Sequence, residues 1–205
     1  MKNKKIDRQK LVSIIIRSKN EEDWIENCLK SIFLQTYKKK EVILIDNFSS
    51  DNTTKIAKKY KIKILKIKKF LPGKAINKGI KIAKGEIIVC LSAHCIPKDD
   101  KWLQNLVRPL LKDSRIKAVY GRQEPYSYSS ALDKRDLLTT FGLDRVIQKK
   151  DPFFHNANSA FLKKIWQKFP FDEKVSNVED RLWGKILIDN NYCIQYEPDA
   201  SVFHW

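Results

Sequence analysis

Apolar runs alternate with amphipathic stretches through the first half of the chain. Residues 11–16, 42–45 and 87–91 are continuous runs rich in branched side chains, which is typical of strands covered on both faces. Residues 62–67 alternate apolar side chains with lysine and predict a more exposed strand. Between the runs, apolar residues recur at three- and four-residue steps, which predicts helices. This order predicts an α/β fold: a doubly wound, mostly parallel sheet with helices on both faces.

The second half of the chain is less regular. Its pattern predicts helices over 98–112, 131–141 and 178–188, and strands over 116–120, 192–196 and 200–203. Residues 154–161 have strand-like ends around two asparagines. No internal repeat or low-complexity linker interrupts the chain, so we expect a single domain over residues 1–205 that begins with a basic tail, residues 1–10.

Polar residues follow three of the predicted buried strands. They are Arg17 to Asn20, Asp46 to Asp51, and the triplet Ser92-Ala93-His94. Carboxyl ends of strands bind ligands in open α/β sheets, so these segments are candidate site residues. Asp46 is suited to accept hydrogen bonds from a base or ribose; the alternative is a helix N-cap. Lys74, beside Gly73 at a helix start, is suited to a phosphate, or is an ordinary surface lysine.

Composition limits the class of protein. No apolar run approaches the roughly 20 residues of a membrane span, and no apolar segment follows the charged start as in a secretory signal. The four cysteines form no CxxC pair, which favours reduced thiols in the cytoplasm. No P-loop or G-x-G-x-x-G motif supports a P-loop or dinucleotide site.

The formal net charge of +17 has several readings. A solvated coat of lysines is one. Attraction to an anionic membrane surface, with peripheral attachment at its inner face, or to phosphorylated ligands is another. The lysines are spread along the chain and are not interleaved with aromatic residues on one motif, so we expect no nucleic-acid partner.

Several segments, in order, resemble the motifs of the family 2 glycosyltransferases of GT-A fold. They are 12–16 with Asn20-Glu21, 45–53, 73–79, 85–88, 156–161, Glu179-Asp180 and 200–204. No single segment carries the resemblance, but together they span nearly the whole chain. The resemblance implies a nucleotide-binding half, residues 11–97, and an acceptor half, residues 98–205.

The resemblance also implies roles for single residues. It places a nucleotide sugar with its base near Asp46 and its diphosphate near Ser92-Ala93-His94. The rest of the implied donor site is Arg17, Ser18, Asn20, Glu21, Asn47 and Lys74. Asp180 becomes the general base of an inverting transfer, with Glu179 beside it. The alternative is that this pair is simply the acidic first turn of a helix.

The triplet Ser92-Ala93-His94 departs from the family's usual Asp-x-Asp, which binds a divalent ion. Three outcomes are open: His94 and His204 share a metal, with Mn²⁺ or Mg²⁺ as candidates and imidazole favouring Mn²⁺; His94 and nearby cations hold the diphosphate without metal; or the protein is inactive. A subset of relatives resembles this chain, with a similar triplet followed by Gly121-Arg122-Gln123 and Pro125, so we interpret the triplet as a variant site. Arg122 is suited to bind phosphate, or to form a salt bridge.

The acceptor side is the least defined. Asn156, Asn158 and Trp183 are candidate contacts for a sugar or acceptor; the alternative is buried turn amides and a core indole. We expect an inverting glycosyltransferase that moves a sugar from a nucleotide sugar to a glycan or lipid-linked glycan, in cell-envelope polysaccharide biosynthesis. The rival is a non-catalytic GT-A-like domain that binds a nucleotide sugar or a partner. A weaker rival is a basic protein that binds nucleic acid.

Overall fold

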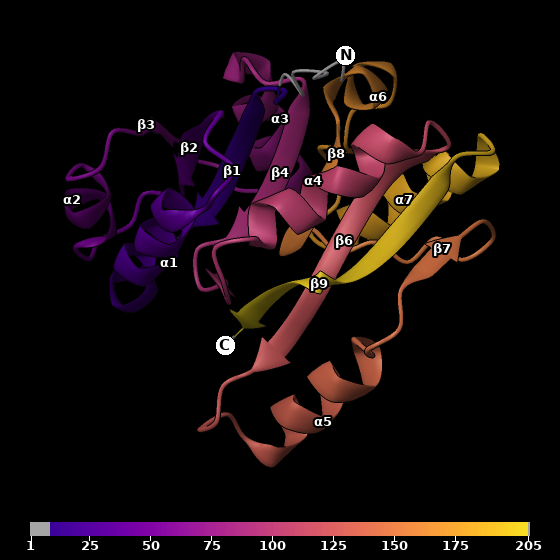
Figure 1. Ribbon diagram of the computed structural model, residues 1–205. Coiled ribbons are helices and arrows are strands. Elements are labelled where there is room, and N and C mark those ends of the chain that lie inside the picture. Colours follow the sequence, from indigo (N-terminus) through magenta and orange to yellow (C-terminus); the bar gives the residue numbers. More distant parts are fainter. Residues whose placement is uncertain (1–8, 205) are drawn as a thin grey trace, which may run out of the picture.

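The computed structural model describes residues 9–204 and shows a large mixed sheet between helices (Figure 1). The strands are β1 (Val12–Ser18), β2 (Lys40–Asp46), β3 (Lys63–Lys66), β4 (Ile87–Ser92), β5 (Ile96–Pro97), β6 (Ile116–Pro125), β7 (Val146–Gln148), β8 (Asn158–Leu162) and β9 (Cys193–His204). The helices are α1 (Glu22–Leu34), α2 (Thr53–Ala57), α3 (Pro72–Ile82), α4 (Trp102–Lys112), α5 (Ala131–Thr140), α6 (Lys163–Lys168) and α7 (Glu179–Asp189). Most of the predicted basic tail lies outside the described residues.

The strands of the first half form the parallel part of the sheet. The order is β3-β2-β1-β4-β8-β6-β9-β5, with β7 paired to β9. Strands β3, β2, β1 and β4 are parallel, β8 is antiparallel to β4 and β6, and β6 is parallel to β9. In this register Ser18 lies opposite Asp46, and Arg17 lies opposite Ser92. The polar ends of three neighbouring strands therefore meet at one edge, which we call the rim.

Alternate residues of the buried strands face two separate cores. Ile14 and Ile16 of β1 belong to a cluster with buried residues of α1 and α4. Ile15 belongs to a second cluster with residues of α3, α6 and α7. Successive side chains of a strand point to opposite faces, so a strand that is apolar throughout needs a helical layer on each side. The predicted doubly wound α/β arrangement is confirmed.

The second half differs from its prediction in several ways, among them the following three. Residues 192–196 and 200–203 are parts of one strand, β9. A register shift between Gly121 and Gln123, which pair with Glu197 and Val202, absorbs residues 198–201. Strand β6 continues to Pro125, beyond the predicted end at residue 120. The six-residue helix α6 was not predicted; it is too short to show a helical period.

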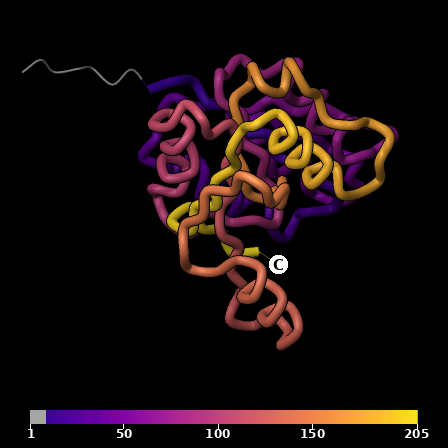
Figure 2. Tube along the Cα trace, turned by 90° about the vertical axis from the view of Figure 1, so that its right-hand side faces the viewer, coloured from indigo at the N-terminus to yellow at the C-terminus, as the bar shows by residue number. Residues whose placement is uncertain are grey.

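Helix α5 projects from the body of the molecule (Figures 1 and 2). None of its residues is buried, and Ser130 caps its first turn by accepting a hydrogen bond from the Asp133 amide, 3.1 Å away. Among residues 9–204, the structure contains no helix long and apolar enough to cross a membrane.

Candidate active site

Buried side chains organise the part of the rim formed by β1 and β2. The Asp46 side chain is fully buried at the end of β2. It accepts hydrogen bonds from the Ser49 hydroxyl at 2.5 Å, the Ser49 amide at 3.2 Å and the Ser18 hydroxyl at 3.5 Å. Asp46 thus stabilises the loop after β2 instead of capping the next helix, and its oxygens do not face open solvent. Its predicted contact with a base stays a prediction.

The loops after β1 and β2 are tied together by side chain–backbone hydrogen bonds. Asn20, with a positive φ of 53°, accepts a hydrogen bond from the Ser50 amide at 2.9 Å. The Glu21 amide donates to the Thr53 hydroxyl at 2.7 Å. The Asn47 amide donates to the Ser18 carbonyl at 2.9 Å. These contacts bring the predicted donor-site residues of the two loops together.

The acidic pair at the start of α7 reaches the same rim. Glu179 is buried and accepts a charged hydrogen bond from Arg17 of β1, with Nη1 and Oε1 3.2 Å apart. Asp180 is partly exposed, and its Oδ2 accepts from the Asn156 amide at 3.1 Å. The next residue along the chain completes the link, because the Ala157 carbonyl accepts from the Ser92 amide at 3.1 Å. Asp180 therefore stands close to the end of β4.

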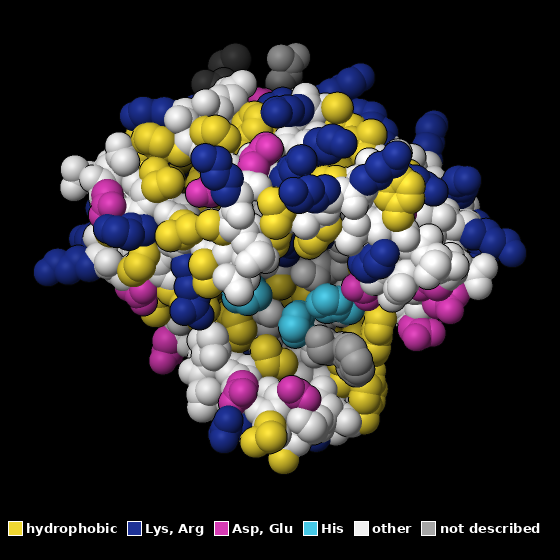
Figure 3. Space-filling model, turned by 180° about the vertical axis from the view of Figure 1, so that it is seen from behind, with side chains coloured by type: hydrophobic (Ala, Val, Ile, Leu, Met, Phe, Trp, Pro, Cys, Tyr) yellow, Lys and Arg dark blue, Asp and Glu magenta, His cyan; other side chains and the backbone are white. Residues whose placement is uncertain are grey.

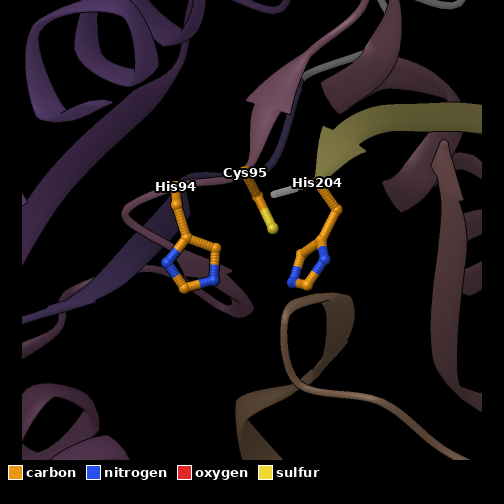
Figure 4. A group of neighbouring side chains, drawn as sticks. All are labelled: His94, Cys95 and His204. Atoms are coloured by element: carbon orange, nitrogen blue, oxygen red, sulfur yellow. The ribbon is translucent and has the colours of Figure 1, made fainter. Parts of the chain in front are cut away.

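His94, Cys95 and His204 form a compact cluster of metal-type ligands (Figure 4). One atom from each lies within 4.8 Å of the others. Nδ1 of His94 is 3.0 Å from Oε1 of Glu21, and the rings of His94 and His204 meet edge to face with centroids 5.0 Å apart. In Figure 4 the other ring nitrogen of His94 points toward His204. A carboxylate on the far nitrogen is the usual partner of a metal-binding histidine.

Burial shifts the pKa values of Cys95 and His204 in this cluster. It lowers the pKa of His204 to about 4, with His94 and His155 adding to the effect. It raises the pKa of the Cys95 thiol well above its usual value. Figure 3 shows the histidine side chains around a hollow on the back of the molecule. A cavity of about 530 Å³ opens beside His204, lined also by Tyr128, Ser129, Ser130, Asp133, Asp136 and Leu137.

His155 is a site residue that the sequence reasoning missed. Its Nδ1 accepts a hydrogen bond from the Ala157 amide at 3.3 Å and lies 3.1 Å from Gln123 Nε2. A backbone amide always donates, so the ring is held with Nδ1 unprotonated. Burial lowers the pKa of His155, Asp180 acts in the opposite sense, and Arg17 and Arg181 lower it further. In the sequence, the feature that could have pointed to His155 is its position directly before Asn156, a predicted site residue.

The three predicted sugar or acceptor contacts have side chains that are buried and engaged within the protein. Asn158 is fully buried; it accepts from the Trp102 indole and donates to two backbone carbonyls. Trp183 is a core residue whose indole donates to the Phe169 carbonyl at 2.7 Å. Asn156, also fully buried, holds Asp180 through its amide, and its side chain accepts from Ser159. These hydrogen bonds fit the alternative of buried structural side chains, and the contact with a sugar or acceptor stays a prediction.

The two predicted phosphate-binding cations occupy different settings. Lys74 lies in the first turn of α3. The segment before this helix is attached to the end of β2, because the Ile67 amide donates to the Asp46 carbonyl at 2.9 Å. Arg122 lies in β6 with Nη1 3.8 Å from Oε1 of Glu124, while its buried Nε has no hydrogen-bond partner among the described residues. The contact of Arg122 with a phosphate stays a prediction.

Solved structures share this architecture. A mannosyltransferase, PcManGT of Pyrobaculum calidifontis, in complex with GDP-Man and Mn²⁺ aligns with a TM-score of 0.75 at 21% identity, over 97% of this chain and 57% of that one. TarS 1–349 of S. aureus in complex with UDP-GlcNAc aligns with a TM-score of 0.72 at 17% identity, over 94% of this chain and 58% of that one. At this identity the likeness shows the fold alone, which is the expected GT-A fold.

Sequence relatives agree with the fold. Poly-beta-1,6-N-acetyl-D-glucosamine synthase of Staphylococcus epidermidis is 32% identical over 204 residues, 92% of this chain and 48% of that protein. Glycosyltransferase AglE of Haloferax volcanii is 26% identical over 206 residues, 94% of this chain and 66% of that protein. The chain thus spans about half to two thirds of the length of these curated relatives. A model described as "Glycosyl transferase family 2" matches residues 13–169, well over half of the chain. The chain belongs to glycosyl transferase family 2.

Proposed function

We propose that this protein is an inverting glycosyltransferase that uses a nucleotide sugar and acts on a glycan or lipid-linked glycan of the cell envelope. One observation carries the proposal: the partly exposed carboxylate of Asp180 stands beside the polar rim, joined to the end of β4 through residues 156–157. A general base and a donor site must share one cleft for a sugar to be transferred in a single step.

Asp180 is held as a base. Its Oδ2 accepts from the Asn156 amide and its Oδ1 from the Arg181 amide, so the carboxylate has a fixed orientation at the start of α7. The helix dipole favours a negative charge there. The acceptor hydroxyl gives its proton to Asp180 while its oxygen forms a bond to the anomeric carbon. The bond from that carbon to the diphosphate breaks, and the diphosphate leaves with the electron pair.

The donor is proposed to lie along the rim. Its diphosphate would lie at the end of β4, within reach of His94, and its nucleoside near the loop organised by Asp46 and Asn20. Lys74 in the first turn of α3 supplies positive charge at a helix N-terminus, where phosphate is favoured. The cavity beside His204 carries serine hydroxyls and aspartate carboxylates, which suits hydrogen bonding to sugar hydroxyls.

His94 and His204 would hold a divalent ion, with Cys95 adjacent. The donor set contains two imidazoles and a sulfur, and the carboxylate of Glu21 faces the far side of the His94 ring. It suits an ion that accepts nitrogen ligands, such as Mn²⁺ or Zn²⁺, and suits Mg²⁺ poorly. The PcManGT structure contains Mn²⁺, as does a GalNAc-T7 structure with UDP that aligns with a TM-score of 0.77 at 18% identity, over 97% of this chain and 44% of that one. Such an ion neutralises the charge that develops on a leaving diphosphate.

The proposed compartment is the cytoplasm. All four cysteines are free and buried, which fits a reducing environment. The rival function is a non-catalytic domain that binds a nucleotide sugar without turnover. The experiment described next distinguishes this rival from a transferase.

The test is to replace the proposed base. Asp180→Asn keeps the shape and the contact with the Asn156 amide but removes the proton acceptor. We expect transfer and donor hydrolysis to fall by about 10²–10⁴-fold, with nucleotide-sugar affinity nearly unchanged. Asp189→Asn, at the exposed end of the same helix, is the matched control and should keep wild-type rates. Equal activity of the two variants would exclude Asp180 as the base, and no turnover in the wild type would favour the rival.

A further inference from the structure

The edge of the sheet opposite the rim collects positive charge. There the amino ends of β1, β4 and β6 meet the carboxyl end of β8, because β8 runs antiparallel. The Glu86 amide donates to the Leu11 carbonyl at 3.0 Å, and the Lys163 amide donates to the Glu86 carbonyl at 2.9 Å. Segments far apart in the sequence are thus fastened side by side at this edge.

A groove of about 610 Å³ crosses this edge. We call it the lysine groove. Its charged lining, among residues 9–204, consists of one acid, Glu86, and six lysines, namely Lys10, Lys84, Lys112, Lys117, Lys163 and Lys164. Leu110, Leu111 and Leu162 also line it. The back view in Figure 3 shows Lys and Arg crowded over the half of the molecule away from the histidine hollow.

Among residues 9–204, few acidic groups pair with the lysines of this groove. Glu86 is paired with Lys10 at 2.8 Å, and Lys163 and Lys117 donate to the backbone carbonyls of Ala83 and Ser114. Lys84, Lys112 and Lys164 are exposed. Like charges held together on a fixed framework repel one another, so an anionic partner gains more here than at scattered lysines.

Apolar side chains stand among the lysines. Leu111 beside Lys112 is 44% exposed, and Ile82, two residues before Lys84, is 38% exposed. Exposed apolar residues interleaved with lysine are typical of surfaces that lie in the headgroup region of a bilayer. Within the described ranges, no aromatic residue and no arginine lines the groove, and those are the groups that stack on bases in nucleic-acid sites.

We propose that the lysine groove is a docking surface for an anionic lipid bilayer. The lysine ammonium groups bind lipid phosphates, and the exposed Leu111 of the groove enters between the headgroups. The groove and the rim lie at opposite ends of the same strands, so docking leaves the donor cleft open. The proposal is independent of the transferase activity, and Asp180→Asn should bind vesicles as the wild type does.

The test is co-sedimentation with vesicles at about physiological salt. We expect the full chain to bind vesicles of phosphatidylcholine with about 30% phosphatidylglycerol, and to bind pure phosphatidylcholine at least about tenfold more weakly. The triple variant Lys84→Gln, Lys112→Gln, Lys164→Gln should lose about 100-fold in affinity, roughly a factor of five for each lysine.

The matched control removes the same charge elsewhere. Lys55→Gln, Lys58→Gln, Lys149→Gln alters three exposed lysines, two at α2 and one after β7, and should bind within about threefold of the wild type. An equal loss in both triple variants would show that net charge alone drives binding and would overturn the proposal. Equal binding to both vesicle types, or tighter binding to duplex DNA at the same phosphate concentration, would also overturn it.

Discussion

Arg17 and Glu179 form an ion pair that joins the first strand to the start of α7. Their side chains are 16% and 6% exposed, so the pair is largely removed from water. A charge left alone in such a place is strongly unfavourable, which makes each partner dependent on the other. The pair therefore anchors the start of α7 beside Asp180, and we propose Glu179 as a positioning residue.

His155 should make stability depend on pH. Its pKa is lowered in the folded state, chiefly by burial, so its contribution is fully present above the unfolded pKa of about 6.5 and is lost as pH falls through the lower folded value. We expect the free energy of unfolding, measured by urea titration, to fall as the pH drops from 7 to 5, because the unfolded state then binds a proton that buried His155 does not. His155→Asn should show a flatter dependence, since asparagine still accepts from the Ala157 amide without titrating. Identical slopes would contradict this assignment.

The histidine cluster predicts a response to metal. After treatment with a chelator, added Mn²⁺ or Zn²⁺ should raise the melting temperature, because an ion at about 100 times its dissociation constant stabilises by about 2.7 kcal/mol. Mg²⁺ should act more weakly. His204→Asn should abolish the response, whereas His155→Asn, outside the cluster, should keep it. Thermal unfolding measures this without any assay of transfer, and a full response in His204→Asn would rule the cluster out.

Side-chain surroundings set the limit of sequence reasoning at single positions. The strand-end triplet became a candidate because it follows a buried strand, and residues 179 and 180 because they resemble a family pattern. A buried structural amide and a ligand-contacting amide look alike in a sequence, so the alternatives for Asn158 and Trp183 stayed open. Only the structure shows their hydrogen-bond partners, Trp102 and the Phe169 carbonyl. His155 was missed because its role depends on the hydrogen bond that its ring accepts from the Ala157 amide, and the sequence does not show this contact.

Helix α7 begins at an unusual backbone position. Val178, its N-cap, has φ 57° and ψ 14°, in the left-handed region, which branched side chains rarely adopt. Its side chain is 47% exposed, so packing of this side chain offsets little of the backbone strain. Strain of about 1–3 kcal/mol at such a residue persists where surrounding structure demands it, here directly before the acidic pair.

Relieving this strain should stabilise the protein. Asparagine tolerates the left-handed region, so Val178→Asn should raise the free energy of unfolding by about 0.5–1.5 kcal/mol in urea titration. Val175→Asn makes the same chemical change at a residue without a positive φ and should bring no gain. A destabilised Val178→Asn would mean that the valine side chain contributes contacts that outweigh the strain.

Elements with a strong period were predicted well, and those fixed by distant pairing were not. Helices α1, α3 and α4 follow from apolar residues at helical steps, and β1, β2 and β4 from their continuous apolar runs. The length of β9 depends on how it pairs with β6 across a bulge, which local pattern does not record. Helix α6 is similarly defined by its packing, through Ile165 and Trp166.

At the scale of the whole molecule, the direction of the strands places the candidate site and the lysine groove at opposite edges of the sheet. Parallel strands deliver the polar loops of β1, β2 and β4 to one edge, and the lysines that precede or follow the strands to the other. The net charge of +17 allowed an anionic partner or a plain solvated coat, and composition gave no location for either. Location required the topology, because Lys10, Lys84 and Lys163 are neighbours only once the sheet has formed.

The seven-residue length of β1 then has a consequence for the acceptor. At about 3.3 Å per residue, the strand separates the two edges by roughly 23 Å. With the lysines resting on lipid, a hydroxyl close to the bilayer surface is beyond the reach of Asp180. In the proposed docked position, a glycan that extends outward by several sugar units would reach the cleft, so we expect the protein to lengthen chains and not to prime them.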